Sequence, residues 1–402
     1  MNTFAKSAFL IGSLAVSLNA SSLDFLIENA LSSHPSLQAI KQKIQAIDSN
    51  IALSRQFSNP KLSLSINDIQ LSDIDNRSIE PMQTNMISLE QKLPYFGKRD
   101  AKEQSAKENK KVEQLMLEEV KTELVSRIKQ SAYRVWEFTT LYTIICKFEE
   151  LTQQSIDLNT AYSSTKSNQH MGIMSATMSL SELKIKKNRL LQALKSEYAV
   201  LSYLSFQKVT DLDLSLKMHK LPNLSNLAQG LVNNFTIKTK KSSIDEAKAI
   251  LSLKDLEHYP DPTIKAGYFQ RSSFEDYVSF TIGTALPLYG SEELKSEKQR
   301  KVVLERKNSL ANTELKVNSE LKANYAQMRQ AYITHTILTE ESMPQVEHMF
   351  DLSTSRITSG GDLFKYIDLI KQELALEEQR VRAIGEYHKY EAKIEALLGV
   401  QK

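Results

Sequence analysis

One five-residue motif occurs twice in this chain. Leu93-Pro94-Tyr95-Phe96-Gly97 returns 193 residues later as Leu286-Pro287-Leu288-Tyr289-Gly290. Each copy follows a short run in which apolar and polar residues alternate, and each precedes a long charged run with helical periodicity. Two copies of a motif in the same surroundings indicate a tandem duplication. The sequence therefore predicts two copies of one unit, which consists of a helix, two strands and a long helical hairpin.

The four predicted strands are amphipathic. They cover about residues 61–68 and 85–93 in the first repeat and about 262–270 and 277–286 in the second. Period-two alternation gives each strand one apolar and one polar face. The apolar rows are clearest in the first and last strands, where they are Leu62, Leu64 and Ile66, and Val278, Phe280 and Ile282.

Long helices follow each motif. No proline or glycine occurs between Lys98 and His170, and a helix of about 65 residues would span roughly 100 Å. Breaks at about residue 172 and about residue 360 mark the predicted tips of the two helical hairpins. Pro344 interrupts the second ascending helix, and we expect it to kink that helix.

The duplication divides the chain into a first repeat at 21–210 and a second at 211–402. Residues 1–20 are interpreted as a secretory signal peptide, with Lys6 before a short apolar core. Residue 21 is serine rather than cysteine, so we expect no lipid anchor there. Beyond the signal no run of 18 apolar residues occurs, and no transmembrane helix is predicted.

Composition excludes several classes of protein. Glycine (11) and proline (9) are scarce, which favours long uninterrupted helices. The net charge is only +3 without a concentrated basic block, which argues against nucleic-acid binding. No phosphate loop, zinc signature or nucleophile elbow is present, so we expect neither an enzyme nor a cofactor. The single cysteine, Cys146, is interpreted as a small buried apolar residue.

Strand length and amphipathicity suggest what the repeats build. A strand of about ten residues can cross a bilayer at a tilt. One chain has only four, and an open sheet edge in lipid would leave backbone groups unpaired at several kcal/mol each. We therefore expect a barrel shared between chains, with three chains giving twelve strands. The alternative is an elongated coiled-coil adaptor or scaffold in the periplasm, whose strands form only a capping sheet.

The ordered set of motifs resembles the TolC-like family of outer-membrane efflux proteins. Asn59-Pro60 precedes the first strand, the segment from Gln91 to Arg99 follows the second, and Leu286–Gly290 follows the fourth. The resemblance implies a mainly α chain with a small β part. It also implies a homotrimer with a 12-stranded β-barrel in the outer membrane of a Gram-negative bacterium, above a periplasmic α-helical barrel. The implied partners are a periplasmic adaptor at the helix tips, an inner-membrane RND-type pump and outer-membrane lipid.

Within this family the Pro94–Arg99 segment looks most like the heavy-metal (Cus/Czc-type) branch. The implied function is a passive exit duct for cations such as copper, cadmium, zinc or nickel, and a duct of the same fold for drugs or secreted proteins is the alternative. The acidic pair that narrows the pore in the best-known members has no clean counterpart. Six pore or tip candidates remain, and they are Gly172, Gly360, Gly361, Asp362, Tyr366 and Asp368.

Four side chains near the first tip could bind a soft metal ion. Met171, Met174 and Met178 are spaced to share one helix face, and His170 precedes them. Thioether and imidazole groups suit cuprous ions, although such binding could only be transient in a duct. The alternative is that these methionines pack against a neighbouring helix or an adaptor.

The repeated motif itself is predicted to be a strand-to-helix junction rather than a ligand site. Pro94 and Pro287 would end their strands without a free N–H, while Gly97 and Gly290 would let the chain turn sharply. We also expect the side chains of Glu90 and Lys92 to face the lumen of the barrel.

Overall fold

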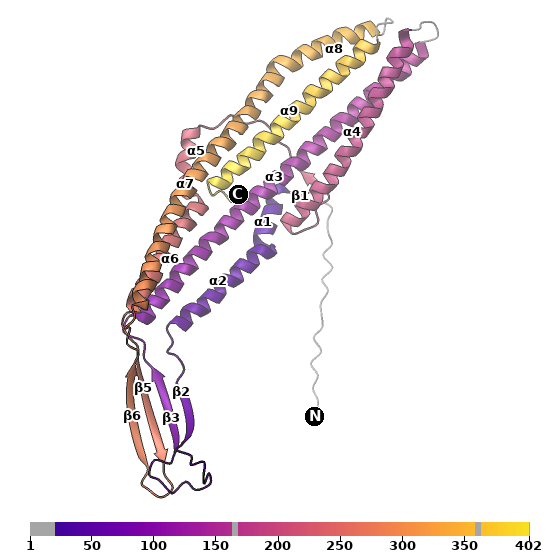
Figure 1. Cartoon of the computed structure of the whole chain (residues 1–402). Coiled ribbons are helices and arrows are strands. Elements are labelled where there is room, and N and C mark those ends of the chain that lie inside the picture. Colours follow the sequence, from indigo (N-terminus) through magenta and orange to yellow (C-terminus); the bar gives the residue numbers. More distant parts are fainter. Residues whose placement is uncertain (1–20, 163–167, 358–362, 402) are drawn as a thin grey trace, which may run out of the picture.

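The computed structural model describes residues 21–162, 168–357 and 363–401. It is an elongated molecule with a sheet at one end and a long helical body at the other (Figure 1). The predicted signal peptide lies outside the described residues. The helices are α1 Leu23–Ser33, α2 Pro35–Ser54, α3 Lys98–Tyr162, α4 Asn168–Ser205, α5 Leu224–Gly230, α6 Phe235–Leu256, α7 Ser291–Ile337, α8 Met343–Ile357 and α9 Leu363–Leu397. The strands are β1 Ser21–Ser22, β2 Lys61–Asn67, β3 Thr84–Lys92, β4 Leu212–Asp213, β5 Pro262–Gln270 and β6 Tyr277–Thr284. The prediction of a mainly α chain with a small β part is confirmed.

The sheet at one end is built from both repeats. Its order is β2-β3-β5-β6, and every neighbouring pair is antiparallel. Each repeat thus supplies one hairpin, and the two hairpins meet at β3 and β5. The strands β2 and β6 are left at the two edges of the sheet.

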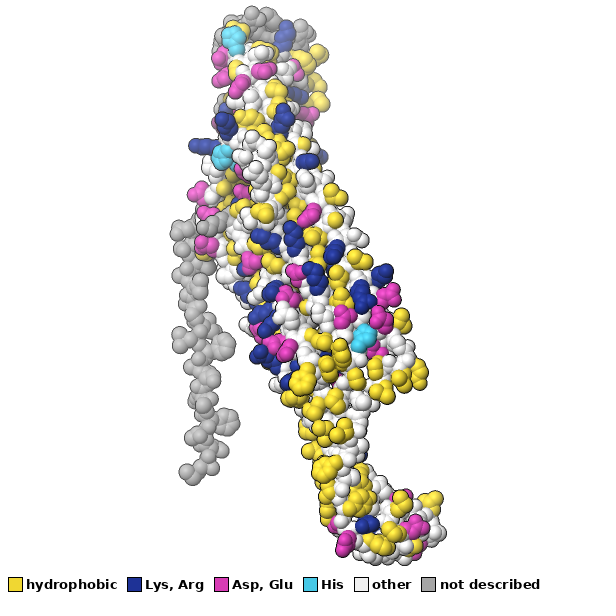
Figure 2. Space-filling model, turned by 90° about the vertical axis from the view of Figure 1, so that its left-hand side faces the viewer, with side chains coloured by type: hydrophobic (Ala, Val, Ile, Leu, Met, Phe, Trp, Pro, Cys, Tyr) yellow, Lys and Arg dark blue, Asp and Glu magenta, His cyan; other side chains and the backbone are white. Residues whose placement is uncertain are grey.

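One face of this sheet is apolar. Cross-strand pairing places Leu64, Ile87, Tyr268 and Val278 in one row and Leu62, Leu89, Ala266 and Phe280 in the next. The opposite face carries Lys61, Glu90, Lys265 and Thr281 in one row. The apolar side chains stay exposed to between 45% and 78%, apart from Ala266, and hydrophobic surface gathers at this end of the molecule (Figure 2). The prediction that each strand has one apolar and one polar face is therefore confirmed. The strand register keeps each face continuous across the sheet.

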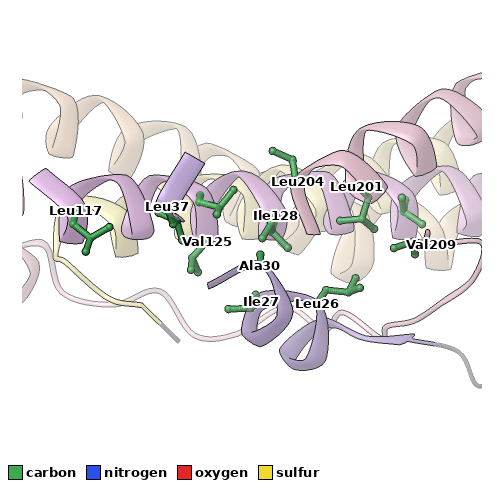
Figure 3. Packing of buried hydrophobic residues seen from close by; sticks show 12 residues of the cluster. Leu26, Ile27, Ala30, Leu37, Leu117, Val125, Ile128, Leu201, Leu204 and Val209 are labelled. Carbon is green, nitrogen blue, oxygen red and sulfur yellow. The ribbon is translucent and has the colours of Figure 1, made fainter. Parts of the chain in front are cut away.

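The helical body is organised around α3, a single helix of 65 residues. It packs against α2, α4, α6 and α9. Near its middle, Ile128 is fully buried under α1 and the end of α4, in contact with a cluster that includes Leu26, Leu37 and Leu201 (Figure 3). This cluster joins the start of the described chain to the first hairpin.

Of two further clusters, one joins the two repeats and the other lies within the second repeat. One lies toward the hairpin tips, where α3 and α4 contact α9 through side chains such as Phe148 and Ile367. The other joins α7 to α9 around Leu321 and Tyr387, which are both fully buried. In the part of the chain that the structure describes, no helix combines the length and the apolar character needed to cross a membrane.

The second ascending helix is interrupted, as the sequence predicts. A π-helical turn at Leu338–Ser342 separates α7 from α8, and Pro344 is the second residue of α8. Proline lacks the N–H needed for an α-helical bond, so a wider turn before it accommodates the loss. The two helices change direction at this point (Figure 1).

Candidate channel tip and strand-to-helix junctions

The two copies of the motif occupy equivalent places in the structure. Pro94 follows β3 and Pro287 follows β6, and each motif leads directly into a long helix. Gly97 has a φ angle of +84° and Gly290 one of +68°. This left-handed backbone conformation is strained for residues with a side chain, which explains the glycine in both copies.

In the first junction the motif is held by the second repeat. Asp261, the residue before β5, accepts a hydrogen bond from the Tyr95 N–H at 3.0 Å. Its carboxylate also binds Lys98 Nζ at 2.7 Å and Lys92 Nζ at 3.2 Å. The rings of Tyr95 and Tyr259 stack with centroids 4.5 Å apart. A single carboxylate thus links the end of β3, the start of α3 and the start of β5.

The electrostatics of Asp261 follow from these contacts. Burial by itself raises the pKa of this carboxyl, but hydrogen bonds from Lys98, the Tyr95 N–H and Lys92 outweigh burial and hold the pKa below its ordinary value. A lowered pKa means that the ionised carboxylate stabilises the folded state. This contribution is present above the ordinary aspartate pKa of about 3.9 and is lost as the pH falls through the lowered value.

Replacing Asp261 by Asn should therefore destabilise the junction in a pH-dependent way. We expect Asp261→Asn to lower the free energy of unfolding by about 1–3 kcal/mol at pH 7, with a smaller difference below about pH 4. Unfolding of the detergent-purified protein followed by circular dichroism measures this. Asp255→Asn is the control, because Asp255 and Arg300 form a pair at 3.6 Å with both side chains about half exposed. A loss that is the same at both pH values would contradict the ionic role.

The second junction has no such partner within the described residues. Its apolar side chains are exposed, with Leu286 at 63%, Leu288 at 74% and Tyr289 at 94%. No charged side chain occupies the place that Asp261 takes in the first junction. The two junctions thus share a backbone but differ in what covers them.

The tip residues proposed from the sequence are only partly brought together. Gly172 lies inside α4 rather than at a turn, because α4 already begins at Asn168. A Cβ atom on Gly172 would lie 3.1 Å from the Leu363 Cβ at the start of α9, so Gly172 is a close-packing position between the two hairpins. The tip predicted at about residue 172 is therefore misplaced, because that residue lies within α4. Gly360, Gly361 and Asp362 lie outside the described residues.

The two remaining pore candidates have different environments. Tyr366 is 8% exposed and packs on Phe350 of α8, with ring centroids 5.2 Å apart. Asp368 is exposed and accepts a hydrogen bond from Gln372 Nε2 at 2.8 Å, one turn along α9. Within one chain Tyr366 is thus buried between α8 and α9, whereas Asp368 is open to solvent, and both stay candidates for the pore or tip.

The methionines at this end form an exposed stripe. Met171, Met174 and Met178 of α4 are 71%, 67% and 67% exposed. His170 is in the same helix, and its side chain lies outside what the structure describes. Among the described residues no three His, Cys, Asp or Glu side chains are grouped to hold a metal ion. Three thioethers on one helix surface can pack against another helix or bind a soft metal ion transiently.

Asp261 and Tyr259 are the functional residues that sequence reasoning missed. Asp261-Pro262 was recognisable only as a helix stop equivalent to Asn59-Pro60. The difference between Asp261 and Asn59 was the available signal, but its meaning depends on Lys98, which is 163 residues away in sequence.

This architecture is similar to that of known outer membrane channels. Residues 26–141 match the family model described as outer membrane efflux protein. No curated protein sequence matches the chain. Among solved structures, the open-state MtrE outer membrane channel of Neisseria gonorrhoeae is similar with a TM-score of 0.79, 13% identity, and coverage of 94% of this chain and 89% of MtrE.

Two other channels have the same fold. The CmeC outer membrane channel of Campylobacter jejuni gives a TM-score of 0.77 at 12% identity, over 100% of this chain and 94% of CmeC. CusC gives 0.73 at 15% identity, over 96% of each chain. At these identities the likeness shows a common fold.

Proposed function

We propose that this chain, whose residues 26–141 match the outer membrane efflux protein model, is a member of that family and that three copies of it form the exit duct of a tripartite system that exports metal cations. As an outer-membrane efflux channel it is a passive duct and not an enzyme. The sheet is the part that enters the outer membrane, and the helical body extends into the periplasm.

The observation that best supports a trimer is that both edge strands of the sheet lack a pairing partner within the chain that the structure describes. The described chain has four long strands in one sheet, with β2 and β6 at its edges. An apolar sheet face suits lipid, but open edges there would leave backbone N–H and C=O groups unpaired. Pairing β6 of one copy with β2 of the next closes the sheet. Three copies give twelve strands.

The helical body, like the sheet, has outer sides that a neighbouring copy could contact. α3 lies between α4 and α9 toward the tips and between α2 and α6 nearer the sheet. On its outer side α7 exposes Leu304 (51%) and Leu315 (73%). These exposed apolar side chains support packing of neighbouring helical bodies side by side. An adaptor or scaffold without a barrel has no need of the exposed apolar sheet face.

The partners follow from the ends of the duct. A duct through the outer membrane needs a source of substrate, so we propose a periplasmic adaptor at the hairpin tips and an inner-membrane RND-type pump behind it. The Met171, Met174 and Met178 stripe lies next to the start of α4, where an adaptor would dock. Methionine adapts to varied apolar surfaces, which suits this contact.

The proposal that the exported substrate is a metal cation is based on the sequence resemblance. The Pro94–Arg99 segment is similar to the heavy-metal branch, and CusC is one of several channels with this fold. Metal export is therefore proposed from the sequence resemblance, with His170 and the methionine stripe as a place of transient contact.

A deletion strain tests the cargo. We expect loss of the protein to make cells several-fold more sensitive to one or more of Cu, Cd, Zn and Ni, with resistance restored by the wild-type chain. Minimum inhibitory concentrations for these metals and for a set of detergents and dyes provide the measurement. Sensitivity to detergents and dyes alone would contradict metal export.

Complementation with Met171→Leu, Met174→Leu and Met178→Leu combined is the matched arm. Leucine keeps the apolar volume and removes the thioether. Full resistance with this variant means that the sulfur atoms are not needed for export, as expected of a stripe that only packs. Loss of copper resistance alone means that the sulfur atoms contact the metal.

A further inference from the structure

We propose that neighbouring copies pair through β6 and β2 in one fixed antiparallel register, with Ile282 of one copy opposite Leu64 of the next and Thr281 opposite Ser65. This inference rests on the proposed assembly of several copies and adds the residues that meet. It follows from the internal duplication, because the same contact already exists once inside each chain.

The strands of the two hairpins correspond residue by residue in their pairing. Pro60 corresponds to Pro262, so β2 maps onto β5 by adding 202 to each number. Leu93 corresponds to Leu286, so β3 maps onto β6 by adding 193. In the first hairpin Leu62 lies opposite Leu89, and these shifts turn that pair into Ile264 and Ile282. Ile264 does lie opposite Ile282 in the second hairpin, so the two registers agree.

The contact between the repeats supplies the template for the contact between copies. In the centre of the sheet β3 pairs with β5, with Ser88 opposite Gly267 and Leu89 opposite Ala266. The mapping carries Ser88 to Thr281 and Gly267 to Ser65. It carries Leu89 to Ile282 and Ala266 to Leu64. The β3–β5 pairing therefore predicts a single register for β6 against β2 of the next copy.

The faces of the sheet provide an independent check. Leu64 and Ile282 both belong to the apolar face and are 75% and 77% exposed in one chain. Ser65 and Thr281 both belong to the polar face. A register displaced by one residue would place apolar beside polar side chains across the contact. The deduced register keeps both faces continuous from one copy to the next.

The same mapping applies to the hydrogen bonds at the strand-to-helix junctions. Inside the chain, the Leu93 N–H donates to the Pro262 carbonyl at 2.8 Å. The mapped bond runs from the Leu286 N–H to the Pro60 carbonyl of the next copy. Likewise the Tyr95 N–H bond to Asp261 maps to the Leu288 N–H and the Asn59 side-chain oxygen. In one chain the Leu288 N–H donates to the Leu286 carbonyl at 2.9 Å, so on assembly it would exchange this partner for Asn59. The segments 56–60 and 286–290 are both exposed in one chain, as expected for two halves of one contact.

Disulfide cross-linking tests the register in the full-length protein. In a Cys146→Ser background, Ser65→Cys is combined with Thr281→Cys, and outer membranes are oxidised with copper phenanthroline. We expect covalent dimers and trimers on a non-reducing gel. The bracketing controls combine Ser65→Cys with Ser279→Cys or with Gly283→Cys, which keep the same face but lie two residues away. Their yield should be about tenfold lower, because diagonal neighbours exceed disulfide reach.

The outcomes separate this register from the proposed function. Strongest cross-linking in either bracketing pair, or none in a particle whose mass in detergent is that of a trimer, overturns the register and leaves the duct intact. A purified particle with the mass of a monomer overturns the assembly itself.

Discussion

Replacing Phe280 by Arg should prevent the protein from entering the outer membrane. Phe280 is 78% exposed on the apolar face of β6. An arginine on a lipid-facing strand costs about 2–4 kcal/mol near the bilayer midplane, and a trimer would carry three. We expect the variant to be lost from the urea-washed outer-membrane fraction, measured by quantitative immunoblot, and to accumulate as unassembled chain or degradation products.

The matched control is Gly283→Arg on the same strand. Gly283 belongs to the polar face, and a Cβ built there meets no atom within 4 Å. This arginine should therefore point into a wet lumen and leave membrane insertion near the wild-type level. Equal loss of both variants would mean that β6 rejects charge on either face, and the assignment of a lipid-facing side would be wrong.

The second large effect concerns the junction between copies. Inside a chain Asp261 is neutralised by Lys98, whereas the equivalent residues at the proposed interface are Asn59 and Ser291, both uncharged. Asn59→Asp would place a carboxylate there without a cation, at a cost of about 1–3 kcal/mol for each junction. We expect the temperature at which the trimer dissociates on a semi-native gel to fall.

Adding Ser291→Lys should reverse this loss. The new lysine takes the place that Lys98 has in the first junction and rebuilds the ion pair between copies. Ser291→Lys alone serves as the control and should change the dissociation temperature little, because no carboxylate from the neighbouring copy faces it. If the double variant is no more stable than Asn59→Asp, then Asn59 and Ser291 do not meet.

Much of the fold could be predicted because periodicity reports directly on burial. The alternation around Leu64 and Phe280 locates two strands and their apolar faces, and the gap without glycine or proline after Lys98 locates a 65-residue helix. The φ angles of Gly97 and Gly290 also agree with the turn expected from the motif.

The tips could not be predicted to the residue. Glycine in a helical sequence signals a turn only when no neighbour needs its small size. Gly172 is instead where α4 approaches Leu363 of α9, a contact between residues 191 apart in sequence. Tyr366 likewise is buried by Phe350 across the second hairpin. Such contacts depend on tertiary packing, about which local patterns say little.

The π-helical turn at Leu338–Ser342 has a consequence for the phase of the second ascending helix. Along α7 the inward positions run through Leu321, Met328, Ala331 and Leu338. A continuous α-helix would place Met349, about three turns after Leu338, on the same inward side. Met349 is instead 45% exposed, and the partly buried Phe350 packs inward. One inserted residue rotates everything beyond it by about 100°. The turn thus resets which side of the ascending helix faces α9, the helix that both α7 and α8 contact.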